Sequence, residues 1–307
     1  MAAQGPSATL PDARPGRLAV GVLGVGRVGA TLGAALQRAG HRVIAASGVS
    51  TDSRRRAEVM LPGVPLVAPD EVLVGAGLVL LAVPDDVLPG LVSGLAASDR
   101  LAPGTLTVHP SGRYGLAVLG PLTRAGGLPL ALHPVMTFAG TGTDLARLAG
   151  AMFGVTAPEP LRPVAEALVI EMGGEPAFVP EAARPLYHAA LAGGANHLMT
   201  LVTTTVDLLR AAGVDQPERM LAPLLGAALD NALRHGDSAV TGPVARGDAG
   251  TVAVHLAALR AAAPETVPGY VALARLTADR ALARRRLTPA AAEALLDVLA
   301  TEGGSAS

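Results

Sequence analysis

The stretch 18-LAVGVLGVGRVG-29 decides the fold of this chain. It begins with a continuous apolar run that ends in glycines, which is typical of a buried parallel strand. A helical pattern follows over residues 31–39, and the apolar run at residues 42–46 predicts a second strand. A GxGxxG motif between a strand and a helix is typical of a dinucleotide-binding βαβ unit. We therefore predict a dinucleotide site at residues 24–29; the alternative is a glycine-rich turn without a ligand.

The residues of this motif have different predicted tasks. Gly24 permits the tight turn, Gly26 lets the backbone approach a pyrophosphate, and Gly29 lets the helix pack on the strand. Arg27 and Val28 stand in the first turn of that helix. A helix N-terminus offers unpaired N–H groups and the positive end of its dipole to phosphates.

The end of the second predicted strand indicates which dinucleotide is bound. NAD-binding chains usually carry an acidic residue there, about 20 residues after the glycines. This chain instead has the hydroxyls of Ser47 and Ser50, followed by Arg54 in an arginine run at 54–56. Hydroxyls and guanidinium groups bind a 2′-phosphate that a carboxylate would repel. We therefore predict NADP (NADPH) as the cofactor; the alternative is that the arginines form a solvated helix face.

The rest of the chain predicts an α/β fold, a doubly wound parallel Rossmann sheet followed by an all-α domain. Short apolar runs that predict further strands, each followed by a proline, lie at residues 78–83, 105–109 and 130–133. Beyond Pro180 only helical patterns occur, at residues 182–212, 217–235, 251–263, 267–285 and 289–300. The predicted parts are a disordered tail (1–16), an NADP-binding domain (17–180) and a helical substrate and dimerisation domain (181–302).

Composition removes several kinds of chemistry. Cysteine and lysine are absent, so all 24 basic residues are arginine. Without cysteine the chain has no disulfide, thiolate nucleophile or cysteine metal site. Without lysine it has no Schiff-base chemistry and no lysine general acid. The histidines form no ligand-spaced cluster with a carboxylate, so we predict no metal.

Charge and hydropathy bear on partners and location. The formal net charge of −1 offers no electrostatic footprint for nucleic acid. The longest apolar run, residues 72–83, is too short to span a membrane and contains two glycines. Residues 1–16 hold no continuous apolar stretch and do not resemble a signal peptide. We therefore expect a cytoplasmic protein.

Four segments resemble a known family of bacterial Rossmann-like proteins whose C-terminal half is a helical domain of unknown function. They are VHPSGRYG (108–115), LHPVMTFAG (132–140), LYHAALAGGANHL (186–198) and TGPVARGDAGTVAVHL (241–256). The architecture is also similar to pyrroline-carboxylate reductases, prephenate dehydrogenases and ketopantoate reductases. The resemblance implies an NADP-dependent reductase or dehydrogenase that dimerises through its helical domain, with ketopantoate as one candidate substrate.

The chain departs from this resemblance at one position. Hydroxyacid dehydrogenases of this architecture usually carry a catalytic lysine on the first helix after the Rossmann domain, with an asparagine one turn later. Asn196 lies on the corresponding predicted helix, but this chain has no lysine. The proton for a developing alkoxide must then come from another group.

Histidine suits that role because its pKa lies near neutrality. His133 is our first candidate, because it ends a predicted strand, and its pairing with Pro134 resembles the HP pair of prephenate dehydrogenases. The alternative is a structural histidine that bonds a turn. The loop after His109 is more typical of backbone shaping, with Ser111 near the nicotinamide amide.

Other candidates flank this site. Val83 and Pro84 end a strand at the carboxyl edge, where Pro84 turns the chain under the cofactor. His188 and Asn196 are eight residues apart, so they share a face of a regular helix and are predicted to bind substrate; the alternative is an interhelical hydrogen bond.

In the segment 241–248, Thr241 and Arg246 are predicted substrate residues. The guanidinium of Arg246 presents a planar fork to a carboxylate or a phosphate, and Asp248 is predicted to cap the next helix. Together these residues favour an NADP-dependent oxidoreductase that reduces a small 2-oxo acid, such as ketopantoate, or an imine. The alternative is a dinucleotide-binding sensor or scaffold without turnover.

Overall fold

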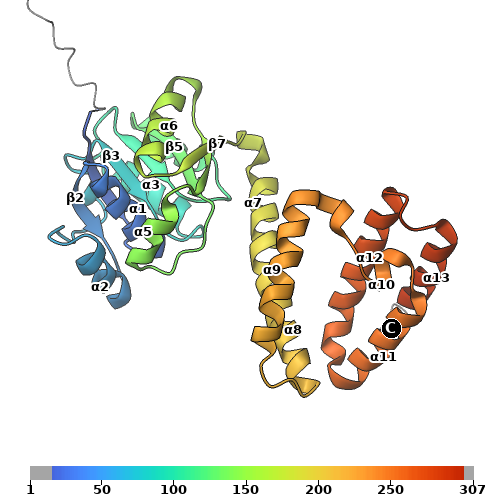
Figure 1. Ribbon diagram of the computed structural model, residues 1–307. Helices are drawn as coiled ribbons and strands as arrows, with labels where there is room; N and C mark the ends of the chain where they lie inside the picture. Colours follow the sequence, from blue (N-terminus) through green and yellow to red (C-terminus); the bar gives the residue numbers. More distant parts are fainter. Residues whose placement is uncertain (1–15, 301–307) are drawn as a thin grey trace, which may run out of the picture. The chain divides into compact units, whose positions relative to one another are not determined.

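The computed structural model describes residues 16–300, which form two compact units (Figure 1). The first unit runs to Gly193 and the second begins at Gly194. The predicted tail at residues 1–16 lies, apart from Gly16, outside the described residues, as do residues 301 and 302 of the predicted helical domain.

The first unit is built on one sheet of seven strands, in the order β2-β1-β3-β4-β5-β6-β7. The strands are β1 (Ala19–Leu23), β2 (Arg42–Ser47), β3 (Leu78–Leu81), β4 (Leu106–His109), β5 (Leu128–Pro134), β6 (Met152–Thr156) and β7 (Glu175–Phe178). Neighbouring strands pair in parallel from β2 to β5. The predicted Rossmann sheet with a helical region after it is therefore confirmed.

The sheet differs from the prediction at its far edge. β6 pairs antiparallel with β5, and β7 pairs parallel with β6. The sequence did not predict either strand, because β6 is short and contains Gly154, and β7 contains Pro176. An edge strand such as β7 tolerates a proline, since one side of it has no ladder partner.

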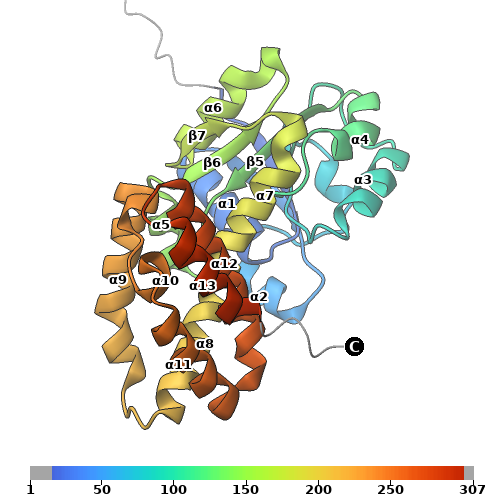
Figure 2. The same cartoon turned by 90° about the vertical axis from the view of Figure 1, so that its right-hand side faces the viewer.

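Helices cover both faces of the sheet, and each face has its own apolar core. Side chains of β3 belong to both of these cores. Leu78 and Leu80 point into the cluster that includes residues of α1, α2, α5 and α6, while Val79 and Leu81 point into the cluster with α3 and α4. Helices α3 and α4 lie side by side (Figure 2). The helices of this unit are α1 (Arg27–Arg38), α2 (Thr51–Met60), α3 (Leu88–Ala97), α4 (Gly120–Arg124), α5 (Gly142–Leu148), α6 (Arg162–Glu171) and α7 (Arg184–Ala192).

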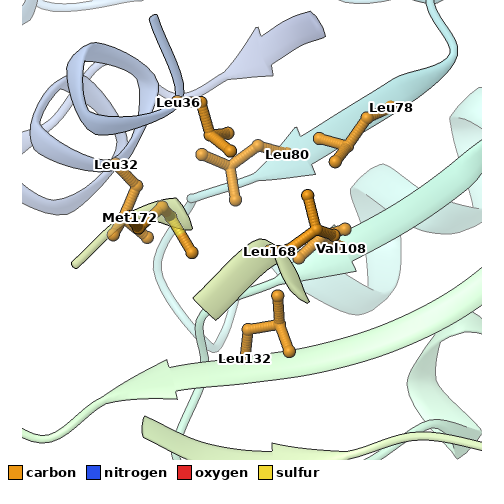
Figure 3. Close-up of a pocket in the computed structure, with 8 residues that line it drawn as sticks. All are labelled: Leu32, Leu36, Leu78, Leu80, Val108, Leu132, Leu168 and Met172. Carbon is orange, nitrogen blue, oxygen red and sulfur yellow. The ribbon is translucent and has the colours of Figure 1, made fainter. Parts of the chain in front are cut away.

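A small gap remains in the first of these cores (Figure 3). Its volume is about 10 Å³, roughly the space of one water molecule. The side chains around it are all apolar: Leu32, Leu36, Leu78, Leu80, Val108, Leu132, Leu168 and Met172. A water needs polar partners, so this gap is a packing defect and not a ligand site.

The second unit is helical, as predicted. Its helices are α8 (Leu198–Ala211), α9 (Pro217–His235), α10 (Pro243–Arg246), α11 (Ala249–Ala262), α12 (Val267–Ala283) and α13 (Pro289–Ala300). The carboxylate of Asp248 caps α11 by accepting from the N–H of Thr251 at 3.0 Å, which confirms the predicted cap. Within residues 16–300, no helix combines the length and apolar character needed to cross a membrane.

The predicted single helix at residues 182–212 is interrupted. α7 ends at Ala192, and a π-helical segment, Gly193–His197, separates it from α8. Two adjacent glycines open this segment, where their low helix propensity weakens the regular pattern. The spacing argument for His188 and Asn196 assumed 3.6 residues per turn throughout, so it no longer applies.

Candidate functional site

The glycine loop is tied to the ends of two strands. Gly24 has a φ of +89°, and a Cβ built there would lie 2.5 Å from the carbonyl oxygen of Ala82, just beyond β3. The N–H groups of Gly24 and Val25 donate to the carbonyl of Ser47, the last residue of β2, at 3.0 and 3.1 Å. Only glycine satisfies both the backbone conformation and the close approach.

The loop is crowded on one side and open on the other. A Cβ on Gly29 would lie 2.0 Å from the carbonyl oxygen of Gly24, so α1 packs directly on the turn, whereas a Cβ on Gly26 would meet nothing within 4 Å. Gly26 precedes α1, and no side chain caps that helix. Val28 packs its side chain on the core, while Arg27 is exposed. The open helix N-terminus therefore has room and N–H donors for a phosphate group.

One of the two hydroxyls predicted to select NADP has a structural role. Ser47 is buried, and the Ser50 hydroxyl caps α2 by accepting from the N–H of Ser53 at 3.1 Å. Arg54 donates from Nε to the carbonyl of Gly48 at 3.2 Å, which leaves its terminal nitrogens without a hydrogen bond to residues 16–300.

Two further arginines converge beside this loop. A Cβ on Gly140 would lie 2.6 Å from Nε of Arg56 and 2.9 Å from Cγ of Arg27. The carboxylate of Asp144 holds the Gly140 turn in place by accepting from the N–H groups of Ala139, Gly140 and Thr141. Burial alone would raise the pKa of Asp144, but these three N–H bonds, together with Arg147, lower it. The positive charge near the loop thus comes from α1 and α2 together.

At the end of β3 the chain turns sharply beside the glycine loop. Cγ1 of Val83 would lie 3.0 Å from a Cβ on Gly24. The carbonyl of Pro84 accepts from the N–H groups of Val87 and Leu88, which closes the turn into α3. Val83 and Pro84 therefore lie where the sequence predicted them, at the carboxyl edge of the sheet.

His109 shapes the loop that follows β4. Its Nε2 donates to the carbonyl of Gly115 at 2.8 Å, and its Nδ1 accepts from the N–H of Ser111 at 3.2 Å. A neutral imidazole with its hydrogen on Nε2 therefore forms both of these hydrogen bonds. Burial is the main reason that the pKa of His109 falls from 6.5 to about 4. The role agrees with the predicted backbone-shaping loop.

Arg184, in the first turn of α7, is buried at 1% exposure and binds this loop to the sheet. Its guanidinium donates to the carbonyls of Ser111 (3.2 Å), Ala131 (3.0 Å) and Gly154 (2.9 Å), and to the hydroxyl of Thr156 (2.8 Å). Burial is the main reason that the pKa of Arg184 is lowered. One side chain therefore connects the loop after β4, strands β5 and β6, and α7.

Glu181 gives the loop a second anchor. Its carboxylate accepts from the N–H groups of Leu116 (2.7 Å) and Ala117 (3.1 Å). A Cβ on Gly115 would lie 2.0 Å from that carboxylate, so the loop needs glycine there. Together, Glu181 and Arg184 attach the start of α7 to the loop that carries Ser111.

A hydrogen-bonded pair, His133 and Tyr187, stands beside these anchors. Nδ1 of His133, near the end of β5, lies 2.8 Å from the hydroxyl of Tyr187 on α7. Gly154 is directly opposite His133 on β6, and a Cβ there would lie 2.2 Å from the Tyr187 oxygen. Glycine at position 154 therefore makes room for the hydroxyl that contacts His133.

A second histidine, His188, lies near this pair, beside Gly112. A Cβ on Gly112 would lie 2.9 Å from Nε2 of His133 and 2.8 Å from Cδ2 of His188. The two rings meet edge to face with their centroids 6.4 Å apart. His133 and His188 thus pack against Gly112, while Tyr187 packs against Gly154.

The imidazole of His133 is neutral at neutral pH. Burial, followed by the positive charge of Arg184, lowers its pKa from 6.5 to about 4. Burial is also the main reason that the pKa of Tyr187 is raised. The sequence argument assumed a group that titrates near neutrality, and that assumption is wrong for His133 because it ignored desolvation.

The other predicted site residues belong to the second unit. Asn196 lies in the π-helical segment and is exposed. Thr241 and Arg246 stand at the two ends of the turn around α10, and both line one pocket of this unit. Among residues 16–300, no three His, Cys, Asp or Glu side chains come together in a group that could hold a metal ion.

Sequence comparisons agree with this architecture. Residues 3–134 match the model of a Rossmann-like domain, and residues 151–277 match the domain of unknown function DUF2520. The chain therefore combines a Rossmann-like domain with a C-terminal DUF2520 domain, as the resemblance predicted. No curated protein matches the chain.

Solved structures share the fold at low sequence identity. A "putative NADP oxidoreductase" from Bacteroides fragilis is 19% identical with a TM-score of 0.73, and the match covers 86% of this chain and 98% of that one. An imine reductase from Pseudomonas sp. is 19% identical with a TM-score of 0.57, covering 94% and 95%. Pyrroline carboxylate reductase from Plasmodium falciparum with NADP bound is 11% identical with a TM-score of 0.54, covering 88% and 97%.

The neutral histidines predict a pH dependence of stability. A histidine whose pKa is about 4 when folded and 6.5 when unfolded binds a proton only in the unfolded chain between these values. Stability is then complete above pH 6.5 and falls as the pH drops to 4. For fully buried His109 the expected loss is roughly 3 kcal/mol. Urea unfolding at pH 7, 5.5 and 4.5 measures it.

NMR titration of the ring signals provides the site-specific check. The His109→Asn and His133→Asn variants assign the two signals by their disappearance. Both rings are expected to remain neutral until the pH approaches 4. A midpoint above pH 6 for either ring would contradict the desolvation argument.

Proposed function

We propose that this protein is an NADP-dependent oxidoreductase that reduces a small 2-oxo acid, such as ketopantoate, or an imine by hydride transfer in the cytoplasm. One observation carries the proposal. The open glycine loop and the His133–Tyr187 pair both stand at the carboxyl edge of the parallel strands, within the same compact unit. Ligands of open α/β sheets bind along that edge. The solved structures with the same fold that are described as reductases support this choice.

The glycine loop and the strand ends would hold the dinucleotide. The backbone of residues 24–29, including the N–H groups of Arg27 and Val28, would bind its phosphates at the α1 N-terminus. Arg54 and Arg56 would contact a 2′-phosphate, near Ser47 and Ser50. Val83, Pro84 and Ser111 would line the nicotinamide end. When bound, the reduced nicotinamide supplies a hydride.

His133 would supply the proton in its neutral form. With Nδ1 accepting from the Tyr187 hydroxyl, the hydrogen of the imidazole sits on Nε2, which packs closely against Gly112. As negative charge develops on the substrate, Nε2 gives up its proton while Nδ1 takes the proton of Tyr187. Tyr187 then recovers a proton from solvent. Because the lowered pKa keeps the ring neutral at pH 7, His133 would act as a neutral electrophile with Tyr187 as its proton source.

The remaining candidates would bind substrate. His188 lies beside Gly112, next to the proposed proton donor. Asn196, Thr241 and Arg246 stay proposed substrate residues of the second unit. The second candidate function is a sensor or scaffold that binds a dinucleotide without turnover, and the absence of lysine favours it. Oxidation of NADPH in the presence of 2-oxo acids or cyclic imines distinguishes the two.

We also propose a homodimer formed through the second unit. Helix α9 buries only Pro217 and Leu221. Met220 and Leu224, 56% and 63% exposed, lie on one face, while Leu229 and Leu233, 49% and 80% exposed, lie about 180° away at 3.6 residues per turn. A helix that is apolar on opposite faces needs to be covered on both, and a second copy supplies the same helices by symmetry.

The first prediction concerns the cofactor. The double variant Arg54→Gln with Arg56→Gln should lower the affinity for NADPH by about tenfold or more, since a hydrogen bond to a charged group contributes roughly 1.5–3 kcal/mol. Affinity for NADH should not change. Arg55→Gln is the matched control, because Arg55 is exposed on the same helix. Fluorescence titration measures all three proteins with both cofactors, and equal or tighter binding of NADH by the wild type would contradict the proposal.

The second prediction concerns proton transfer. His133→Asn should lower turnover by roughly 10²–10⁴-fold, the usual effect of losing a general acid. Affinity for NADPH should hardly change, because the phosphates are proposed to bind at the glycine loop. His188→Asn should act mainly on the apparent KM. Steady-state kinetics with an active 2-oxo acid or imine decide this, and full activity in His133→Asn with none in His188→Asn would reverse the assignment.

The third prediction concerns assembly. Light scattering at micromolar concentration should give twice the chain mass of 30.6 kDa. Leu224→Glu with Leu233→Glu, one change on each face of α9, should give the single-chain mass. Val59→Glu on α2, where Val59 is 74% exposed, is the control and should leave the dimer intact. A monomeric wild-type chain would refute the proposal.

A further inference from the structure

The second unit contains a pocket of about 400 Å³ that is lined by five residues: Val240, Thr241, Ala245, Arg246 and Arg286. Its volume lies within the range of small-molecule sites, about 300–1,000 Å³. Two of the five side chains are guanidinium groups, one is a hydroxyl, and none is acidic.

Backbone geometry brings the two arginines together from distant parts of the sequence. α10 lies between Gly242 and Gly247, which have φ values of +100° and +73°. A Cβ on Gly247 would lie 2.7 Å from the side chains of Leu287 and Ala291, so the end of α10 packs closely on the start of α13. Arg246 and Arg286, the residues that precede these contacts, therefore open into the same pocket.

The carboxylates around the pocket are engaged elsewhere. Asp248 accepts from the N–H and the hydroxyl of Thr251 at 3.0 and 2.7 Å. Asp237 pairs with Arg280 at 2.7 Å and with Arg284 at 3.5 Å. Within residues 16–300 neither pocket arginine forms a salt bridge with a carboxylate, although the charge of Arg246 helps to lower the pKa of Asp248.

The donors of the two pocket arginines are largely free. Arg286 donates once, to the carbonyl of Val240 at 3.2 Å. The side chain of Arg246 makes no hydrogen bond or salt bridge within the part of the chain that the structure describes. Two guanidinium groups with unused N–H donors thus line a pocket whose lining residues include no carboxylate.

We propose that this pocket binds the oxyanion group of a small organic ligand, a carboxylate or a phosphate. Arg246 and Arg286 would bind the oxygens in the bidentate manner of guanidinium groups, and Thr241 would donate a third hydrogen bond. Val240 and Ala245 offer apolar contact to the carbon body of the ligand. The site extends the proposed substrate contacts of Thr241 and Arg246 by adding Arg286, and it does not depend on hydride transfer: a chain without turnover would still bind the anion.

The test uses the full-length protein and measures binding directly. Saturation-transfer NMR detects binding of pyruvate and of inorganic phosphate in the millimolar range, with pyruvamide as the uncharged analogue of pyruvate. At least one anion should bind, and pyruvamide should not. Binding of pyruvate alone assigns the site to carboxylates, and binding of phosphate alone assigns it to phosphate groups.

Variants then place the anion in the pocket. Arg246→Gln and Arg286→Gln should each weaken anion binding by about tenfold or more, the effect of losing a charge-assisted bond. Arg285→Gln is the matched control, because Arg285 is exposed in the same arginine run but does not line the pocket. The side chain of Arg246 makes no hydrogen bond within the described fold, so Arg246→Gln stays folded and informative even if Arg286→Gln does not.

Three results would overturn the proposal. These are absence of binding by both anions, unchanged binding in Arg246→Gln, and an equal loss in Arg285→Gln. None of them involves the oxidation of NADPH. The anion site and the proposed reductase activity can therefore fail separately.

Discussion

The buried guanidinium of Arg184 is the interaction on which the candidate site depends. It donates to three backbone carbonyls and one hydroxyl that belong to separate parts of the sheet. A buried charge without a carboxylate partner is stable only when hydrogen bonds replace its hydration. Because those bonds go to the strand ends and to the loop after β4, they fix the positions of Ser111, His133 and Tyr187 relative to one another.

The same charge sets the chemistry of its surroundings. Burial and the positive field of Arg184 both lower the pKa of His109 and His133. Each ring is therefore neutral and has a defined use for its nitrogens: His109 bonds the loop on both sides, and His133 shares one nitrogen with Tyr187. Both ring nitrogens of His109 bond the backbone, whereas Nε2 of His133 lies beside Gly112.

Local patterns in the sequence predicted most of the fold but only part of the site. The β1–α1–β2 unit, the strand ends and the helices α9 and α13 follow from apolar runs, glycines and prolines that act over a few residues. β6 and β7 were missed because Gly154 and Pro176 weaken the strand pattern. Arg184 and Tyr187 were missed because nothing near them in sequence signals burial: their partners lie between 28 and 73 residues away, on β5, on β6 and in the loop after β4. The desolvation that lowers the pKa of His133 also comes from residues that are distant in the sequence, so local patterns do not predict it.

Helix α7 is held by several hydrogen bonds at its start, but it contacts His133 through only one. Arg184 in its first turn bonds the sheet and Glu181, just before the helix, bonds the loop after β4, while Tyr187 lies one turn further on and contacts His133 through one hydrogen bond of 2.8 Å. The chain leaves α7 through the glycines of the π-helical segment for the second unit. A donor–acceptor distance of about 3.6 Å is too long for a side-chain hydrogen bond. A tilt of α7 about its fastened end by less than an ångström at Tyr187 would thus uncouple the tyrosine from the histidine while leaving the sheet untouched.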